Sequence, residues 1–146
     1  MIVEDDKVSE MLIDLTVKMF SKEIIKAKTG VEAIEACQKN PDIDLVMMDI
    51  RMPDMGGYKA TRQIREFNKE VVIIAQTAYG ISGDGEKAIE AGCNDYITTV
   101  SYTHLRAHET VLDLVCRLLL EKKKKKVKNI NKKRESIKTK THKHVR

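Results

Sequence analysis

Hydrophobic residues follow two alternating patterns along residues 1–99. One pattern is a short continuous apolar run, typical of a strand buried on both faces of a sheet. The other places apolar residues three and four positions apart, typical of an amphipathic helix. The predicted strands are Ile2-Val3, Glu23–Lys28, Leu45–Met48, Val71–Ala75 and a run starting at Tyr96-Ile97. The predicted helices are Val8–Phe20 (stripe Val8, Met11, Leu12, Leu15 and Met19), a segment after Gly30 with Ala33, Ile34 and Cys37 inward, Tyr58–Phe67 and Glu86–Ala91.

Strict alternation of strands and helices predicts an α/β fold, with a five-stranded parallel sheet and helices on both faces. Ligands of such sheets bind beyond the carboxyl ends of the strands. Those ends are acidic here, because the first strand runs into Glu4-Asp5-Asp6 and the third into Asp49. Carboxylates brought together repel one another, and Mg²⁺ with oxygen ligands relieves that repulsion. Thr77 adds a hydroxyl at the end of the fourth strand.

A single Asp at a strand end is more often a helix cap or a turn residue than a ligand. That interpretation applies to Asp54 and Asp84, which lie in loops by composition. Glu4, Asp5 and Asp49 differ because each closes an apolar strand of one parallel sheet. A shared site is therefore the better interpretation for these three residues.

The same residues resemble a known family, the receiver domain of two-component response regulators. The resemblance covers about residues 1–99 and implies a flavodoxin-like fold that takes a phosphoryl group from a histidine kinase or a histidine phosphotransfer protein. It is carried by Ile2-Val3-Glu4-Asp5-Asp6, by Leu45-Val46-Met47-Met48-Asp49-Ile50-Arg51-Met52-Pro53-Asp54-Met55-Gly56-Gly57, by Thr77-Ala78, and by Ala91-Gly92-Cys93-Asn94-Asp95-Tyr96-Ile97-Thr98.

The resemblance also implies a role for individual residues. Asp49 would be the phosphoacceptor, and its carboxylate would act as the nucleophile towards phosphorus. Glu4 and Asp5 would form the acidic pair, with Mg²⁺ held by Asp5, Asp49 and the backbone carbonyl of Arg51. The switch would consist of the Thr77 hydroxyl, the adjoining Ala78 and the aromatic ring of Tyr96.

Two departures from the family pattern stand out. The family has a few more apolar residues before the acidic pair, so Met1 resembles a start inside a longer reading frame. The family also has Lys and then Pro after the stretch Tyr96-Ile97-Thr98, where this chain has Thr99 and Val100. The missing ammonium group would pair with the phosphoryl group, so we expect its absence to weaken phosphorylation or to uncouple it from switching.

Charge divides the chain near residue 99. Residues 1–99 hold 12 Lys and Arg against 18 Asp and Glu, whereas residues 100–146 hold 15 against 4, giving net charges of −6 and +11. Residues 100–126 resemble the translation of a transposase-type sequencing adapter, with Lys122–Lys126 read from a poly-A extension. We therefore expect a truncated receiver domain over 1–99 without its native final helix, followed over 100–146 by a non-native or unstructured basic tail. Amplifying the locus from source DNA tests this expectation.

The apolar run Val111–Leu120 makes residues 108–126 compatible with a helix, so a helix there would not show that the segment is native. The tail lacks a helix-turn-helix pattern and, over residues 127–146, any aromatic residue for base stacking. No apolar run approaches the roughly 20 residues that span a bilayer, and no leader pattern opens the chain. We therefore expect neither a nucleic-acid nor a membrane partner for this domain.

The chain has 146 residues and three widely spaced cysteines, which predicts one domain in the reducing cytoplasm rather than a large enzyme. The predicted function is that of a phosphoacceptor in a phosphorelay, not of an enzyme. The alternatives are an interaction module on the same fold that is never phosphorylated, and a small phosphatase on a related fold. The phosphatase is disfavoured because no acid–base residue is evident outside the acidic cluster.

Overall fold

The computed structural model describes residues 1–77, 83–98 and 105–142, with side chains described outside 105–112 and 133–142. Five parallel strands form one sheet in the order β2-β1-β3-β4-β5. The strands are β1 (Ile2–Val3), β2 (Lys26–Ala27), β3 (Leu45–Asp49), β4 (Val72–Thr77) and β5 (Asp95–Thr98). The helices are α1 (Lys7–Val17), α2 (Gly30–Lys39), α3 (Gly57–Phe67), α4 (Asp84–Ala91) and α5 (Leu105–His142). The predicted α/β fold is confirmed.

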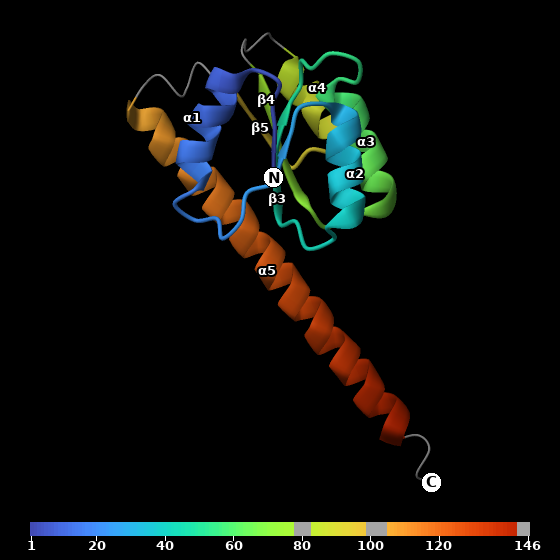
Figure 1. Cartoon of the computed structure of the whole chain (residues 1–146). Helices are drawn as coiled ribbons and strands as arrows, with labels where there is room; N and C mark the ends of the chain where they lie inside the picture. The colour runs from blue at the N-terminus through green and yellow to red at the C-terminus, as the bar shows by residue number, and fades with distance from the viewer. Residues whose placement is uncertain (78–82, 99–104, 143–146) are drawn as a thin grey trace.

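Helices cover both faces of the sheet (Figure 1). Alternate residues of each strand point to opposite faces, so the sheet separates two hydrophobic clusters. The cluster under α2, α3 and α4 includes Val3, Val46, Met48, Ile73 and Ala75 from the strands. The cluster under α1 and α5 includes Ile2, Met47, Val72, Ile74 and Ile97. Both clusters include strand residues that lie one or two positions before the predicted acidic residues, so the packed core holds the carboxyl ends of these strands in position.

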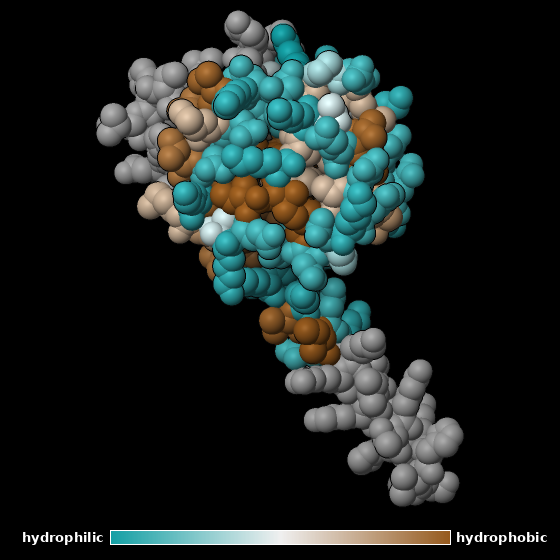
Figure 2. Space-filling view, in the orientation of Figure 1, coloured by the Kyte–Doolittle hydropathy of each residue, from teal (hydrophilic) through white to brown (hydrophobic). Residues whose placement is uncertain are grey.

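Helix α1 turns its apolar stripe away from the sheet. The residues of α1 that are buried are Ile13, Thr16 and Val17. The residues of the predicted stripe are exposed, from 38% at Leu12 to 81% at Met19, and include Val8, Met11 and Leu15. Figure 2 shows apolar side chains over the α1 side of the molecule. The amphipathic helix is confirmed, but its spacing did not identify the buried face.

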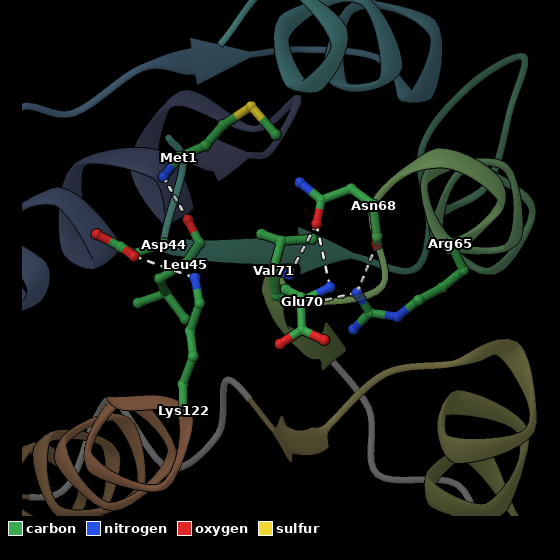
Figure 3. Close-up of polar contacts among 8 residues, drawn as sticks. All are labelled: Met1, Asp44, Leu45, Arg65, Asn68, Glu70, Val71 and Lys122. Carbon is green, nitrogen blue, oxygen red and sulfur yellow. Dashed lines mark hydrogen bonds and ion pairs between the residues drawn. The ribbon is translucent and has the colours of Figure 1, made fainter. Parts of the chain in front are cut away.

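Helix α5 packs on the sheet beside α1 through residues near Val115. Val115 is fully buried in the cluster under α1 and α5, and Leu114, Leu118 and Leu119 pack against that cluster. Lys122 adds an ion pair at 3.0 Å to Asp44, which precedes β3 (Figure 3). Beyond this contact the helix continues away from the domain (Figure 1).

The helix is longer than the range of 108–126 that the sequence indicated. It extends over Leu105–His142 because residues 93–146 contain neither Gly nor Pro and are rich in Lys, a good helix former. Among the described residues, no helix is both long and apolar enough to cross a membrane. Residues 100–104 and 143–146 lie outside the described residues.

Polar contacts fix the entry to the central strands (Figure 3). The amino group of Met1 donates to the carbonyl of Leu45 at 2.6 Å, which joins β1 to β3. The Arg65 Nη1 donates to the carbonyls of Asn68 at 3.1 Å and Val71 at 2.8 Å, which ties the end of α3 to the start of β4. These hydrogen bonds hold the starts of β3 and β4 in place.

Two of the three cysteines lie in the core. Cys37 and Cys93 are buried on the α2 and α3 side of the sheet, and burial raises the pKa of both thiols. Cys116 is exposed on α5. All three cysteines are free thiols.

Candidate functional site

Three carboxylates meet at the carboxyl edge of the sheet, as predicted. Glu4 and Asp5 follow β1, and Asp49 is the last residue of the neighbouring strand β3. One carboxylate oxygen from each of the three residues lies within 4.8 Å of those from the other two. Glu4 and Asp49 are buried, whereas Asp5 is exposed. The third acidic residue of the motif, Asp6, caps α1 instead, because its Oδ2 accepts from the Ser9 N–H at 2.8 Å.

The Glu4 carboxylate is held on both oxygens. Its Oε1 accepts from the backbone N–H of Asp6 at 3.1 Å, and its Oε2 accepts from the side-chain Nε2 of Gln76 at 3.1 Å. Burial, and next the nearby charge of Asp49, raise the pKa of Glu4 to about 7. The site therefore disfavours the ionised form of Glu4 while it contains no cation.

Asp49 is fixed by the strand that carries it and by the loop that follows. Its Oδ1 accepts from the backbone N–H of Arg51 at 3.1 Å, so the Arg51 peptide lies beside the cluster. Burial raises the pKa of Asp49 as well. A cation that favours both ionised carboxylates would lower both pKa values, so it would bind with release of protons at acidic pH.

The start of α3 lies directly against the end of β3. The Gly57 N–H donates to the Ile50 carbonyl at 3.0 Å. A Cβ at Gly57 would lie 2.1 Å from the carbonyl oxygen of Asp49, so no other residue fits here without moving the backbone. Gly57 thus permits the close approach that holds Asp49 at the sheet edge.

The predicted switch residues lie on the next two strands. Thr77 ends β4, is fully buried, and is paired in register with Thr98 of β5. The ring of Tyr96 packs against the start of α4, where a Cβ at Gly85 would lie 3.0 Å from its Cε1. Ala78 and Thr99 lie outside the described residues.

Gln76 is a site residue that was not predicted from the sequence. It is the residue of β4 in register with Asp49, and it is fully buried. The available signal was a polar amide in a strand that is otherwise apolar from Val71 to Ala75. Its contact with Glu4 could not be predicted, because that contact depends on the conformation of a long side chain.

The donor set fits a hard divalent cation. It consists of carboxylate oxygens from three residues, with the Arg51 peptide beside them. Oxygen ligands at an acidic strand edge are what Mg²⁺ prefers, whereas zinc sites use His and Cys. Among the described residues, the one group of such side chains close enough to share an ion is this cluster.

Comparison with known proteins identifies the family. A sequence model described as the response regulator receiver domain matches residues 1–105. The chain belongs to the response regulator receiver domain family. A receiver domain in a two-component system works in a phosphorelay, so the predicted function class is confirmed.

Two curated relatives show receiver domains in different settings. Hybrid signal transduction histidine kinase I of Dictyostelium discoideum is 32% identical over 140 residues, which cover 90% of this chain and 8% of the kinase. The polar-differentiation response regulator DivK of Brucella ovis is 30% identical over 100 residues, covering 67% of this chain and 80% of that protein. The chain therefore corresponds to most of a small regulator but to a small part of the hybrid kinase.

Two solved structures of similar receiver domains contain a bound metal ion or a partner protein. The receiver domain of a sensor histidine kinase from Pseudomonas aeruginosa, with a magnesium ion in its active-site cleft, is 29% identical with a TM-score of 0.69, over 81% of this chain and 93% of that chain. A Saccharomyces cerevisiae receiver domain, crystallised with a histidine phosphotransfer protein, is 32% identical with a TM-score of 0.59, over 66% and 74%.

Proposed function

We propose that this receiver domain accepts a phosphoryl group on Asp49 from a phosphohistidine of a histidine kinase or a histidine phosphotransfer protein. The observation that carries the proposal is the convergence of Glu4, Asp5 and Asp49 at one edge of the sheet. In the transfer, an Asp49 oxygen forms a bond to phosphorus while the bond from phosphorus to the donor imidazole nitrogen breaks. The imidazole leaves with the electron pair of that bond.

The residues around Asp49 provide positioning and electrostatics, which account for most of the catalysis of phosphoryl transfer. The Arg51 N–H orients the Asp49 carboxylate through Oδ1. Asp5, Asp49 and the Arg51 carbonyl would hold Mg²⁺, with Glu4 completing the acidic pair. When bound, Mg²⁺ neutralises charge on the transferring oxygens.

We infer that Thr77, Ala78 and Tyr96 form the switch that reports phosphorylation. Thr77 is at the end of the strand next to β3, so its hydroxyl can turn towards a phosphoryl group on Asp49. Movement of Thr77 would shift β5, because Thr77 is paired with Thr98. Tyr96 lies on the same short strand, which links the shift to the ring beside α4.

We further propose that the domain is a phosphoacceptor and not an enzyme, and that it works in the cytoplasm. One solved relative supports the phosphoacceptor part of this proposal, since that receiver was crystallised with a histidine phosphotransfer protein. We propose no nucleic-acid or membrane partner for the domain.

The experiment that tests the proposal is Mg²⁺-dependent labelling with acetyl phosphate. We expect slow Mg²⁺-dependent labelling of the unaltered protein, since it lacks the Lys of the family pattern, and none after Asp49→Asn, because the amide is not a nucleophile. Asp54→Asn is the matched control, since Asp54 is exposed and its φ of 66° is one that Asn tolerates. Equal labelling of the Asp49 variant would put the phosphoryl group on another residue and overturn the role of Asp49. No labelling of either protein would favour the alternative of an interaction module that is never phosphorylated.

A further inference from the structure

Gln76 lies in the middle of the sheet, behind the acidic cluster. It is paired in register with Asp49, and its backbone carbonyl accepts from the Ile50 N–H at 3.0 Å. Its side chain is completely buried. The residues before it on the same face of β4, Val72 and Ile74, belong to the apolar cluster under α1 and α5. An amide at this position is therefore an exception in an apolar layer.

The amide of Gln76 reaches across the central strand. Strand β3 lies between β1 and β4, and the Gln76 Nε2 donates to Oε2 of Glu4, which follows β1. This buried hydrogen bond joins residues that are 72 positions apart. With the Asp6 N–H on the other oxygen, it fixes both ends of the Glu4 carboxylate.

The other end of the amide has no partner. Among the described residues, the buried Oε1 of Gln76 accepts no hydrogen bond. A buried acceptor without a donor costs about 1–3 kcal/mol, so a Met of similar length would avoid that cost. The amide is therefore not explained by packing. Because Oε1 is bonded to the same carbon as Nε2, it lies in the same buried space beside Glu4.

We propose that Gln76 is a positioning residue of the cation site, which binds Glu4 through Nε2 and offers Oε1 to water carried by the cation. The inference rests on the proposed function, since it assigns a role towards the same Mg²⁺. Mg²⁺ keeps several of its waters in protein sites, and those waters are hydrogen-bond donors. The loaded site thereby provides the donor that Oε1 lacks among the described residues.

The first test is the Mg²⁺ affinity of the full chain, measured by calorimetry. Partners of metal ligands typically contribute 10-fold to 100-fold to metal affinity, so Gln76→Met is expected to raise the Mg²⁺ Kd by about tenfold or more. Thr61→Val is the matched control, because Thr61 is equally buried but contacts Cys93 on the opposite face of the sheet. A Kd for Gln76→Met within about twofold of the unaltered protein would overturn the proposal.

The second test uses the unaltered chain, so it does not depend on the folding of a variant. The side-chain amide resonance of Gln76 is followed by nitrogen-15 NMR during addition of Mg²⁺. We expect the Gln76 resonance to shift with the same midpoint as Mg²⁺ binding. The side-chain amide resonance of Asn94 should not shift, because Asn94 Oδ1 accepts from Arg65 Nη2 and the Ile73 N–H at the other end of β4. A Gln76 resonance that does not move would overturn the proposal.

The two tests separate this inference from the proposed function. Mg²⁺ binding that is independent of Gln76, together with labelling of Asp49, would overturn the role of Gln76 alone. Mg²⁺ binding that depends on Gln76, without labelling of Asp49, would support the role of Gln76 and overturn the phosphoacceptor function. A chain that binds no Mg²⁺ would overturn both.

Discussion

Glu4 is a carboxylic acid whose burial sets its response to pH. Its pKa in the folded protein is about 7, compared with an ordinary value of 4.5, chiefly because of burial. Between these two values the folded protein keeps a proton that the unfolded chain releases. Stability from this group is therefore complete below about pH 4.5 and is lost as the pH rises through about 7.

We predict that the free energy of unfolding without Mg²⁺ falls between about pH 5 and pH 8. The contribution of Glu4 to this fall is at most about 3 kcal/mol, from 1.36 kcal/mol per pKa unit. Urea denaturation at both pH values, for the unaltered protein and for Glu4→Gln, measures it. The Gln variant should lose most of the pH dependence, and equal dependence in the two proteins would contradict the assignment to Glu4.

Thr99 is the position where the family pattern has Lys. An ammonium group there would make a charge-assisted hydrogen bond to the phosphoryl group, which is typically worth about 1.5–3 kcal/mol. We predict that Thr99→Lys speeds labelling by acetyl phosphate by about tenfold. We also predict that it enlarges the change in the environment of the Tyr96 ring on phosphorylation. Thr99→Gln, of similar polarity but without the charge, serves as the control. If neither the labelling rate nor the change at the Tyr96 ring differs, the hypothesis that the missing Lys weakens phosphorylation or switching is refuted.

Residue types at strand ends were sufficient to locate the acidic cluster. Glu4, Asp5 and Asp49 each follow an apolar run, and parallel strands bring such ends to one edge. The sequence did not reveal that Asp6 faces away as the cap of α1, or that Gln76 contacts Glu4. Both facts depend on side-chain conformation, which residue spacing does not determine.

At the scale of elements, strands were more predictable than faces of helices. Leu45–Met48 and Val71–Ala75 were recognised because continuous apolar runs exclude a solvated face. The predicted strand Glu23–Lys28 was too long, since β2 pairs only at Lys26–Ala27, where its neighbour β1 offers two residues. In α1, apolar residues surround most of the helix, so spacing alone did not show that Ile13 and Val17 face inward.

The exposed stripe of α1 is a predicted contact for the phosphohistidine donor. The helix begins two residues after Asp5, so its first turn adjoins the acidic cluster. Apolar residues that remain exposed on one helix face are typical of interaction sites. The stripe consists of Val8, Met11, Leu12 and Leu15, with the exposed Met19 two residues beyond the end of the helix.

We predict that Leu15→Asp slows phosphoryl transfer from a phosphorylated histidine phosphotransfer protein by about tenfold, while labelling by acetyl phosphate is unchanged. A small donor does not need the docking surface, so the two reactions separate docking from chemistry. Ile89→Asp is the matched control, because Ile89 is as exposed on α4 as Leu15 is on α1. Equal slowing by both variants would contradict a specific role for α1.

The whole molecule is a domain with a parallel sheet between two layers of helices, and the long basic helix α5 projects from it (Figure 1). Among the side chains of α5 that the structure describes (113–132), those around Val115 pack into the core, and the last ion pair to the domain is at Lys122. The net charge of +11 over residues 100–146 therefore lies mostly outside the domain that carries the site. The net charge of +5 of the whole chain therefore has the sign of this segment and not that of residues 1–99, whose net charge is −6.

We predict that removing residues 127–146 leaves the free energy of unfolding unchanged, whereas removing residues 105–146 lowers it by about 4 kcal/mol. The second deletion exposes the apolar cluster that Val115 and its neighbours cover, at about 1.5–3 kcal/mol per fully buried side chain. Urea denaturation of the three chains measures both values. Equal stability of all three would show that α5 contributes nothing to the core.

The distribution of the cysteines gives the protein a built-in attachment point for a probe. A thiol reacts as the thiolate, so Cys37 and Cys93, buried and with raised pKa values, are protected from alkylating reagents, while Cys116 is open to them. A maleimide dye or a spin label would therefore attach to α5 without any substitution. The mobility of that label would report directly whether α5 stays on the sheet when Asp49 is modified.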